Sequence, residues 1–549
     1  MKDKKIREYI LPIKILRALL TENKESLLKY NGDQPCFGTG ELCKILPGGY
    51  VLLDFGEEYS GGIKLVIEDC CGESNCRIGI SFGESAMEAM SEIGDKNSCN
   101  DHAIRSTELV APWMGQIEYG NTGFRFARIK NINDFAISFK QVLAIFVHSD
   151  AIKKGSFVCS DERLNKIWEV GTRTIFLNMQ DYVYDGIKRD RLVWIGDMHP
   201  ETSAIIRLFG SDERVEKSLD LVKRTTKFTE WMNGIPSYSM WWLKIVYDYY
   251  FYTGDKSFVL EHIEYISKLT DRLLLCVEKD GTLNVDFKFI DWPSSENSLA
   301  QEAGVRALLY LAIESAKKLL SETGKLDEYT NKRYTETLNI IRKGTEKSTP
   351  NGNKQAAALM CFAGLYDDSK ANEELLSKDP FNGISSFLGY YVLMARAKAG
   401  DMLGSLDLMR KYWGGMIDMG ATTFWEDFNL DWLNNAKPID AILENNEYDI
   451  HGDNGAYCYK GFRHSLCHGW SAGVVPFISE YVLGVKFKEV GCAKIEISPD
   501  LGDLLWAEGN VPTPYGVLKV SIKKTDNGID VKTNELNGVE IVICNFVKG

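Results

Sequence analysis

The hydrophobic period of this sequence changes twice, and these two changes constrain the fold more than any other feature. From about residue 35 to 150, short runs rich in β-branched and aromatic residues alternate with Gly, Asn, Asp and Ser, as in strands that end at turns. Near residue 161 the apolar residues begin to recur at spacings of three and four, the period of an amphipathic helix. After about residue 485 the strand pattern returns. We therefore expect β-domains at both ends and a helical region between them.

The individual elements follow from the same patterns. Ser160 or Asp161 is expected to cap the first helix, and the Asp-Asn-Gly tripeptide at 526–528 predicts a hairpin turn. The predicted strands are 48–56, 62–70, 76–85, 124–132 and 136–149, which form an antiparallel β-domain, and 493–502, 516–534 and 538–547 near the C-terminus. The predicted helices after the first are 214–228, 239–252, 257–277, 298–321, 327–346, 354–365, 384–401, 403–413 and 466–483.

The length of 549 residues is several times that of a usual domain of about 150 residues, which predicts several domains and excludes a small binding module. No motif recurs at a fixed spacing, so an open helical solenoid is disfavoured and the helices are expected to close on themselves. We divide the chain into an N-terminal β-sandwich domain (1–154), a helical domain (155–485) and a small C-terminal β-sandwich domain (486–549).

Charge and composition limit the partners. The net charge of −13 repels phosphate backbones and anionic lipid surfaces, so neither a nucleic acid nor a membrane is an expected partner. The N-terminus lacks a continuous apolar stretch with a cleavage site, and the thirteen cysteines include no Cys-x-x-Cys pair. These features predict a cytoplasmic protein with reduced thiols and with neither a metal nor a cofactor. The oligomeric state is left open.

One segment, Tyr184 to Asp197, has an unusual density of charge. It holds the three carboxylates of Asp185, Asp190 and Asp197 together with two arginines, a lysine, a tryptophan and two glycines. One interpretation is a solvated loop in which the arginines neutralise the acids. The other is a catalytic segment, which requires a second carboxylate elsewhere in the chain.

Glu426 is the candidate for that second carboxylate. It lies between Trp425 and Asp427, directly after a Gly-rich turn. Glycoside hydrolysis needs one carboxyl group to protonate the leaving oxygen and another to activate water or attack carbon, and aromatic faces pack against the sugar ring. Asp190 and Glu426 are therefore the predicted catalytic pair, unless Glu426 is only a surface acid.

Further candidates for sugar contacts lie in the helical region, and each has a plainer interpretation. Trp241 and Trp242 are adjacent on a predicted helix, so at most one of them faces a site. Asp291 and Trp292 form an acid–aromatic pair, but Asp291 also fits a helix cap. His468 suits either a sugar contact or a core position in which its ring is satisfied by a backbone carbonyl.

Several segments together resemble the bacterial α-L-rhamnosidases of glycoside hydrolase family 78. DGIKRDRLVWIGD is similar to the signature of that family, and the resemblance extends in the expected order from about residue 45 to 545. The other matching segments are SYSMWWLKIVYDYYFYTGD, GATTFWED, SLCHGWSAG and AKIEISPDLGDLLWAEGNVPTPYGVLKVS.

The resemblance implies an (α/α)6 barrel flanked by β-sandwiches and an inverting, exo-acting hydrolysis of terminal α-linked rhamnose or a similar sugar. It places Asp190 at the general acid and Glu426 at the general base. The family usually has Glu at the acid position, and Asp190 reaches about 1.5 Å less far; Val193 also stands where the family has Gly. The positions that the resemblance assigns to sugar binding or to support of the acid are Asp185, Arg189, Trp194, Asp197 and His468.

Two other functions stay open on the sequence. A carbohydrate-binding relative could keep the pocket but lack activity because the usual acid has been lost. A hydrolase of another sugar, such as a uronide, would need a cationic clamp for the substrate carboxylate, and Arg189 is the obvious candidate in the motif. All three interpretations have a carbohydrate as partner.

Overall fold

The computed structural model describes residues 4–37, 40–444 and 446–544, and it divides into two compact units that alternate along the chain. The first unit consists of Met1–Asp150, Phe176–Leu192 and Gly415–His468, and the second of Ala151–Ile175, Val193–Gly414 and Gly469–Gly549. The fold is thus multidomain, with a sheet-rich N-terminal part and a helical core. The domain boundaries predicted at 154 and 485 stay predictions.

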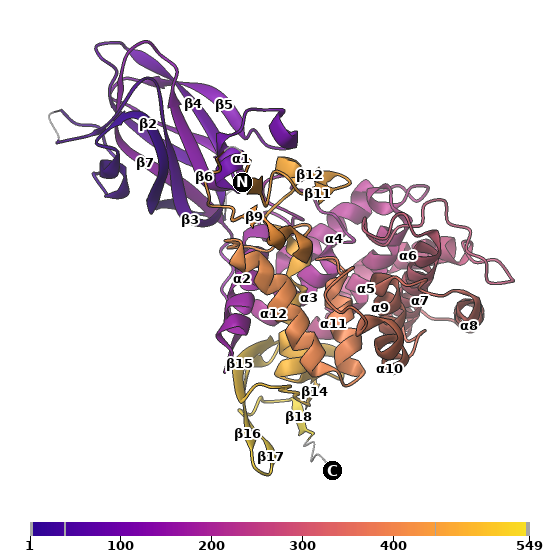
Figure 1. Ribbon diagram of the computed structural model, residues 1–549. Helices are drawn as coiled ribbons and strands as arrows, with labels where there is room; N and C mark the ends of the chain where they lie inside the picture. Colours follow the sequence, from indigo (N-terminus) through magenta and orange to yellow (C-terminus); the bar gives the residue numbers. More distant parts are fainter. Residues whose placement is uncertain (1–3, 38–39, 445, 545–549) are drawn as a thin grey trace. The chain divides into compact units, whose positions relative to one another are not determined.

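An antiparallel sheet of seven strands forms the body of the first unit (Figure 1). Its strands follow the order β1-β7-β3-β6-β4-β5, and β2 pairs with β3. All five strand runs predicted for the N-terminal part lie in this sheet, within β3, β4, β6 and β7. The bounds are β1 Ile6–Ile10, β2 Lys14–Glu22, β3 Cys43–Asp69, β4 Asn75–Gly83, β5 Ser106–Pro112, β6 Gln116–Asn131 and β7 Ile137–His148.

The two runs predicted as separate strands at 48–56 and 62–70 form one long strand, β3. The glycines between them are not a turn. A side chain at Gly61 would clash with the carbonyl oxygen of Ile145 in β7, and one at Gly62 would clash with that of Tyr119 in β6. These glycines therefore allow the neighbouring backbones to approach closely.

The first unit also holds shorter elements. In α1, Ser85 is the N-cap, and its hydroxyl accepts a hydrogen bond from the backbone of Glu88 (3.2 Å). The bounds are η1 Lys24–Leu28, α1 Ala86–Met90, η2 Asp95–Asn97, η6 Leu430–Asn434, β9 Ala436–Lys437, β10 Tyr448–Asp449, β11 Gly455–Ala456, β12 Tyr459–Lys460 and η7 Gly461–Arg463.

Helices dominate the second unit, and most of the predicted helices are confirmed. The helix predicted at 466–483 is instead a series of short 3-10, α and π segments that begins at Gly469, and the helix Met198–Leu208 was not predicted. Asp161 is the residue that caps α2, because its carboxylate accepts from the backbone N–H groups of Arg163 (2.8 Å) and Leu164 (3.2 Å). The bounds are α2 Glu162–Asn178, whose last turn belongs to the first unit, α3 Met198–Leu208, α4 Glu213–Thr225, η3 Met232–Gly234, α5 Pro236–Thr253, α6 Lys256–Leu274, α7 Ser298–Glu322, α8 Glu328–Gly344, η4 Thr345–Lys347, α9 Lys354–Phe362, α10 Asp368–Ala371, η5 Asn372–Leu376, α11 Gly389–Lys398, α12 Met402–Asp418, η8 Gly469–Gly473, α13 Val474–Phe477 and η9 Ile478–Val482.

Burial divides these helices into two kinds. Thirteen of the eighteen residues of α5 are buried, whereas only three of the seventeen residues of α8 are. A helix that is apolar all round belongs inside a fold, and one with a single apolar face belongs at its surface. The contacts agree with this division, because α3, α5, α7, α9, α11 and α13 touch one another in a closed circuit in which α13 returns to α3.

Strands follow the helices in the second unit. One sheet has the order β13-β14-β18 and the other β17-β16-β15-β8, so a strand that precedes the helices, β8, joins the C-terminal strands. The predicted hairpin at 526–528 is confirmed by the pairing of Thr525 with Gly528. The last part of the strand predicted at 538–547 lies outside the described residues. The bounds are β8 Ser156–Cys159, β13 Val485–Phe487, η10 Val490–Cys492, β14 Lys494–Ile497, β15 Trp506–Thr513, β16 Gly516–Thr525, β17 Gly528–Thr533 and β18 Glu540–Ile543.

Within the described ranges, every helix is too short or too polar to cross a lipid bilayer.

Candidate functional site

Residues 185–192 of the charged segment form a closed loop in the first unit. The backbone N–H of Asp185 donates to the carbonyl of Leu192 (3.1 Å), and the N–H of Leu192 donates to the Asp185 carboxylate (2.9 Å). Inside the loop, Asp190 and Arg191 have φ angles of 58° and 54°, in the left-handed region that non-glycine residues rarely adopt. The loop is therefore a strained turn with defined contacts.

Arg189 connects the two predicted catalytic carboxylates. Its Nη2 donates to both oxygens of Glu426 (2.7 and 2.9 Å), its Nη1 donates to Asp190 (2.9 Å), and its Nε donates to the carbonyl of Arg463 (3.0 Å). Burial by itself lowers the pKa of Arg189, but the two carboxylates outweigh burial and leave this pKa raised. A single cation thus fixes both acids.

These contacts limit the distance between the two acids. The terminal nitrogens of one guanidinium lie about 2.3 Å apart, so Asp190 Oδ1 and Glu426 Oε1 are at most about 8 Å apart. The sequence separation of the two residues gives no hint of this distance. The structure therefore brings Asp190 and Glu426 together, as predicted.

The segment around Ser465 also holds Glu426 in place. Its backbone N–H donates to the carbonyl of Ser465 (2.9 Å), and the backbone N–H of Ser465 donates to the Glu426 carboxylate (3.1 Å). The carboxylate is 5% exposed. Its neighbour Trp425 is also buried and packs edge-on against Phe428 and His464.

Two buried histidines flank Glu426. His468 Nε2 lies 3.8 Å from both Glu426 Oε1 and Asp185 Oδ2. His464 Nε2 accepts a hydrogen bond from the backbone N–H of Asp427 (2.9 Å). Burial lowers the pKa of each histidine to about 3; Arg189 adds to this effect at His468, whereas Glu426 opposes it at His464. Both rings are therefore neutral at pH 7.

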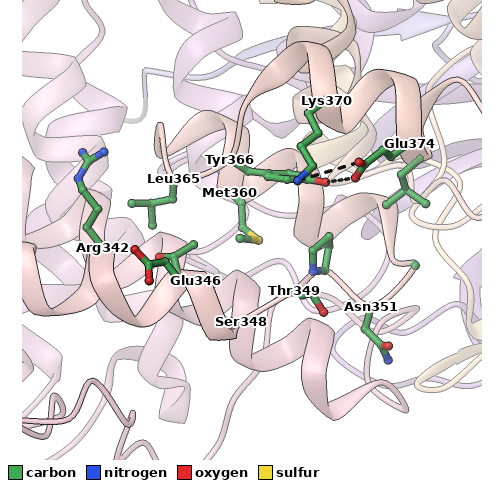
Figure 2. Close-up of a pocket in the computed structure, with 14 residues that line it drawn as sticks. Arg342, Glu346, Ser348, Thr349, Asn351, Met360, Leu365, Tyr366, Lys370 and Glu374 are labelled. Atoms are coloured by element: carbon green, nitrogen blue, oxygen red, sulfur yellow. Dashed lines mark hydrogen bonds and ion pairs between the residues drawn. The ribbon is translucent and has the colours of Figure 1, made fainter.

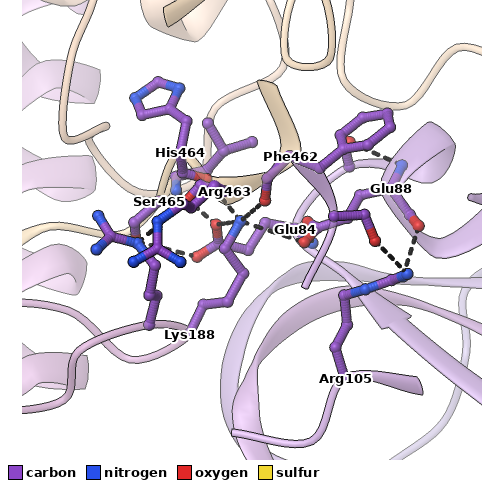
Figure 3. A network of polar contacts seen from close by, with 12 residues as sticks. Glu84, Glu88, Arg105, Lys188, Phe462, Arg463, His464 and Ser465 are labelled. Atoms are coloured by element: carbon purple, nitrogen blue, oxygen red, sulfur yellow. Dashed lines mark hydrogen bonds and ion pairs between the residues drawn. The ribbon is translucent and has the colours of Figure 1, made fainter. Parts of the chain in front are cut away.

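Lys188 lies at the centre of a buried polar network beside this site (Figure 3). Its ammonium contacts the carboxylates of Glu84 (2.9 Å) and Glu88 (3.2 Å) and donates to the carbonyls of Phe462 (2.9 Å) and His464 (2.6 Å). Burial by itself lowers the pKa of Lys188, but the two carboxylates outweigh burial and raise it. Burial also raises the pKa of Glu84, and Lys188 opposes that rise.

The same network contains the residues most able to hold a metal ion. Glu84, Glu88 and His451 each place one ligand atom within 4.8 Å of the others. Lys188 already contributes a positive charge at the two carboxylates, and His451 Nδ1 lies 2.8 Å from the Ser85 hydroxyl. The donor set therefore suits the lysine, which satisfies both acids without a metal.

Sequence reasoning missed several residues of this site. Glu84 accepts the backbone N–H of Leu466 (2.6 Å) and so supports the segment that holds Glu426. His102 Nε2 lies 3.2 Å from Asp190 Oδ1. Two signals were available in the sequence: the Ser85-x-x-Glu88 capping pattern, and His464 four residues before His468. No comparable signal existed for His102.

The other residues predicted to contact sugar lie in the second unit: Trp194, Asp197, Trp242, Asp291 and Trp292. Asp197 accepts a hydrogen bond from the hydroxyl of Tyr238 (3.0 Å), and Trp194 packs edge-on against the same tyrosine. The indole N–H of Trp194 is buried and makes no hydrogen bond within the described residues.

Three of these second-unit residues have contacts typical of a core or a turn. Trp242 is fully buried, and its indole N–H donates to the carbonyl of Leu219 (3.0 Å). Asp291 accepts from the backbone N–H of Ser294 (3.0 Å) in a turn, and burial raises its pKa. It does not cap a helix, because α7 begins at Ser298 and has Asn297 as its N-cap. Trp292 packs edge-on against Phe289.

A pocket of about 660 Å³ also lies in the second unit (Figure 2). Arg342, Tyr366, Lys370 and Glu374 are among its lining residues, and the hydroxyl of Tyr366 donates to Glu374 (2.8 Å). None of the residues predicted from the sequence lines this pocket. The predicted site is the polar constellation around Arg189 instead.

Comparison with known proteins identifies relatives of this chain. Residues 152–377 match the family model described as the bacterial alpha-L-rhamnosidase 6 hairpin glycosidase domain. An alpha-L-rhamnosidase from Alteromonas sp. strain LOR is 26% identical over 541 residues, which cover 88% of this chain and 54% of that protein. The chain thus spans about half the length of this curated relative.

Solved structures show the same fold. The GH78 family rhamnosidase of Bacillus sp. GL1 superposes with a TM-score of 0.75 at 21% identity, over 95% of this chain and 55% of that one. A rhamnosidase from Klebsiella oxytoca with rhamnose bound has a TM-score of 0.68 at 19% identity, over 86% of this chain and 95% of that one. The resemblance seen in the sequence is confirmed: residues 152–377 are similar to the six-hairpin glycosidase domain of the bacterial α-L-rhamnosidases.

Proposed function

We propose that this chain is an exo-acting glycoside hydrolase that removes terminal α-L-rhamnose, or a closely similar sugar, with inversion. The observation that carries the proposal is the single guanidinium shared by Asp190 and Glu426. It limits their separation to at most about 8 Å, below the upper limit of about 9.5 Å for an inverting pair, and the choice of inversion follows the resemblance to the rhamnosidases. The rhamnosidase relatives support the choice of sugar.

In this proposal Glu426 is the general base and Asp190 serves the acid step. Glu426 takes a proton from a water molecule as that water attacks the anomeric carbon. The glycosidic oxygen leaves from the opposite face of the sugar and receives a proton in the step that Asp190 serves. Arg189 and the backbone N–H of Ser465 hold the Glu426 carboxylate in place. Neutral His468, with Asp185 beside it, is suited to hydrogen bonds with sugar hydroxyls.

The second unit contributes to the proposal through its inner helices. We infer that the closed circuit of α3, α5, α7, α9, α11 and α13 is the inner ring of an (α/α)6 barrel. The proposed sugar contacts in this unit are Trp194 and Asp197. The buried, unbonded indole N–H of Trp194 supports its role, because such groups usually find a partner.

A uronide hydrolase is less well supported. Such an enzyme needs a free cation to clamp the substrate carboxylate. Arg189, the candidate in the motif, already uses Nε, Nη1 and Nη2 for Arg463, Asp190 and Glu426. Each of its three nitrogens therefore already donates within the protein.

The proposal is tested with 4-nitrophenyl α-L-rhamnopyranoside. We expect proton NMR to show β-rhamnose as the first product, and Glu426→Gln to lower turnover by at least about a hundredfold. Glu444→Gln, which changes an exposed acid of the same unit, is the control and should keep wild-type activity. An α-anomer as first product would contradict inversion, and unchanged turnover in Glu426→Gln would contradict the base. A wild type that binds the sugar without cleaving any aryl glycoside would favour the non-catalytic relative.

A further inference from the structure

His102 and Asp190 face each other in the first unit, although no pattern in the sequence predicts a role for His102. His102 Nε2 lies 3.2 Å from Asp190 Oδ1, the same oxygen that accepts from Arg189. The side chains of His102 and Asp190 are 35% and 18% exposed, so both reach solvent beside the buried Glu426. A ligand can therefore reach the His102 and Asp190 side chains from solvent.

The loop that carries His102 is fixed at both ends. On one side, Asp101 forms an ion pair with Arg463, whose carbonyl accepts from Arg189 Nε (3.0 Å). On the other side, the buried guanidinium of Arg105 donates to the carbonyls of Phe82 (3.1 Å) and Glu88 (2.7 Å). His102 is thus positioned by the fold although its ring is partly exposed.

Backbone strain lies on both sides of this contact. His102 has a φ of 64°, and Asp190 and Arg191 have φ angles of 58° and 54°. Left-handed backbone at non-glycine residues is unfavourable, and it concentrates where the surroundings hold a group in place for function. The two partners of this contact both have such a backbone, which is a second indication that the geometry matters.

We propose that His102 is the residue that delivers the proton to the departing oxygen, and that Asp190 orients and stabilises its imidazolium. This inference rests on the proposed function and specifies its acid step. Nε2 faces Asp190, whereas Nδ1 makes no hydrogen bond with any described residue and is available to a substrate. A carboxylate that holds one nitrogen of a catalytic imidazole is a known arrangement in hydrolases.

The proton transfer from His102 and the attack of water together conserve atoms and electrons. The Nδ1–H bond of the imidazolium breaks as an O–H bond forms on the glycosidic oxygen, which keeps the electron pair of the broken C–O bond. Water, losing a proton to Glu426, bonds to the anomeric carbon. His102 then regains a proton from solvent, and Glu426 releases one.

An ordinary imidazole gains and loses its proton near neutral pH, whereas an ordinary carboxyl group does so at lower pH. The charged groups that face His102 are Asp190 and, from its own loop, Asp101; Arg463 and Arg189 lie directly behind these two acids. The proposal therefore expects the alkaline limb of the kcat/KM profile to depend on His102.

The test compares His102→Gln with wild type on two substrates. We expect kcat/KM for an alkyl α-L-rhamnoside to fall by at least about a hundredfold and that for the 4-nitrophenyl rhamnoside by less than about fivefold, because a nitrophenolate needs little protonation. The alkaline limb should move or vanish in the variant. In His102→Ala, added imidazole should restore part of the activity toward the alkyl rhamnoside.

Asp101→Asn is the matched control, because it loosens the same loop without removing the proposed donor. It should slow both substrates to a similar extent. Equal slowing of both substrates by His102→Gln, or none, would overturn the proposal while leaving Glu426 and the hydrolase intact. A wild type that cleaves neither rhamnoside would instead overturn the proposed function together with this inference.

Discussion

Arg189 Nη2 lies 2.7 and 2.9 Å from the two carboxylate oxygens of Glu426, residues 237 positions apart in the chain. Its other terminal nitrogen binds Asp190, so the spacing of the two acids depends on the planar shape of one side chain. This relationship gives the site its geometry and leads to the first prediction.

Arg189→Lys should lower kcat by at least about a hundredfold, because a single ammonium cannot span both carboxylates and small displacements of catalytic groups cost about that much. Arg191→Lys is the control. Arg191 contacts Asn121 and neither catalytic acid, so its replacement should stay within about threefold of wild type. Steady-state kinetics on an aryl rhamnoside measure both variants, and equal effects would show that the guanidinium is not what fixes the pair.

Asp190→Asn should slow alkyl rhamnosides far more than nitrophenyl rhamnosides, since it removes the charge that serves the acid step. Asp190→Glu should not improve rhamnoside cleavage, although it restores the residue usual in the family. The added methylene has to fit between Arg189 and His102, which already contact the shorter carboxylate, and overfilled sites are strained. Faster cleavage by Asp190→Glu would show that the short acid is a defect.

Lys188→Met should destabilise the protein by about 3–5 kcal/mol, because it leaves two buried carboxylates without a counter-charge. Adding Glu84→Gln and Glu88→Gln to this variant should recover most of the loss, since no buried charge then lacks a partner. Urea unfolding gives the free energies. A loss below about 1 kcal/mol in the single variant would mean that solvent reaches the network.

The free energy of unfolding should fall as the pH falls below about 6.5, the ordinary pKa of histidine. In the folded protein the pKa values of His464 and His468 are about 3, so the unfolded chain binds more protons between these values. Each histidine contributes a slope of up to about 1.4 kcal/mol per pH unit in that window. Glu84 acts in the opposite sense, because its raised pKa favours the folded state at low pH.

His464→Gln should therefore flatten the pH dependence of stability, and Glu84→Gln should steepen it. The amide oxygen of Gln can still accept the backbone N–H of Asp427, so the fold should tolerate the first change. Urea unfolding of both variants at pH 7, 6 and 5 provides the comparison. A slope unchanged by His464→Gln would mean that this histidine is protonated in the folded protein.

Much of the fold could be predicted because it depends on local patterns. The strand runs, the helices and the hairpin at 526–528 follow from hydrophobic period and turn residues, which act between near neighbours in the chain. The long strand β3 was split incorrectly because Gly61 and Gly62 look like a turn in the sequence. Only the neighbouring backbones of β6 and β7 reveal their purpose.

The sequence by itself determined which residues are candidates for the site, since Asp190 and Glu426 stand out by their charged and aromatic neighbours. The tertiary structure decided how they are connected: it placed Arg189 between them, Lys188 between Glu84 and Glu88, and His102 against Asp190. Apart from the contact between the neighbours Arg189 and Asp190, these contacts join residues about 90 to 240 positions apart, for example 100 for Glu88 and Lys188 and 237 for Arg189 and Glu426. No local pattern encodes such pairs, because their geometry is set by the packing of segments that meet only when the whole chain has folded.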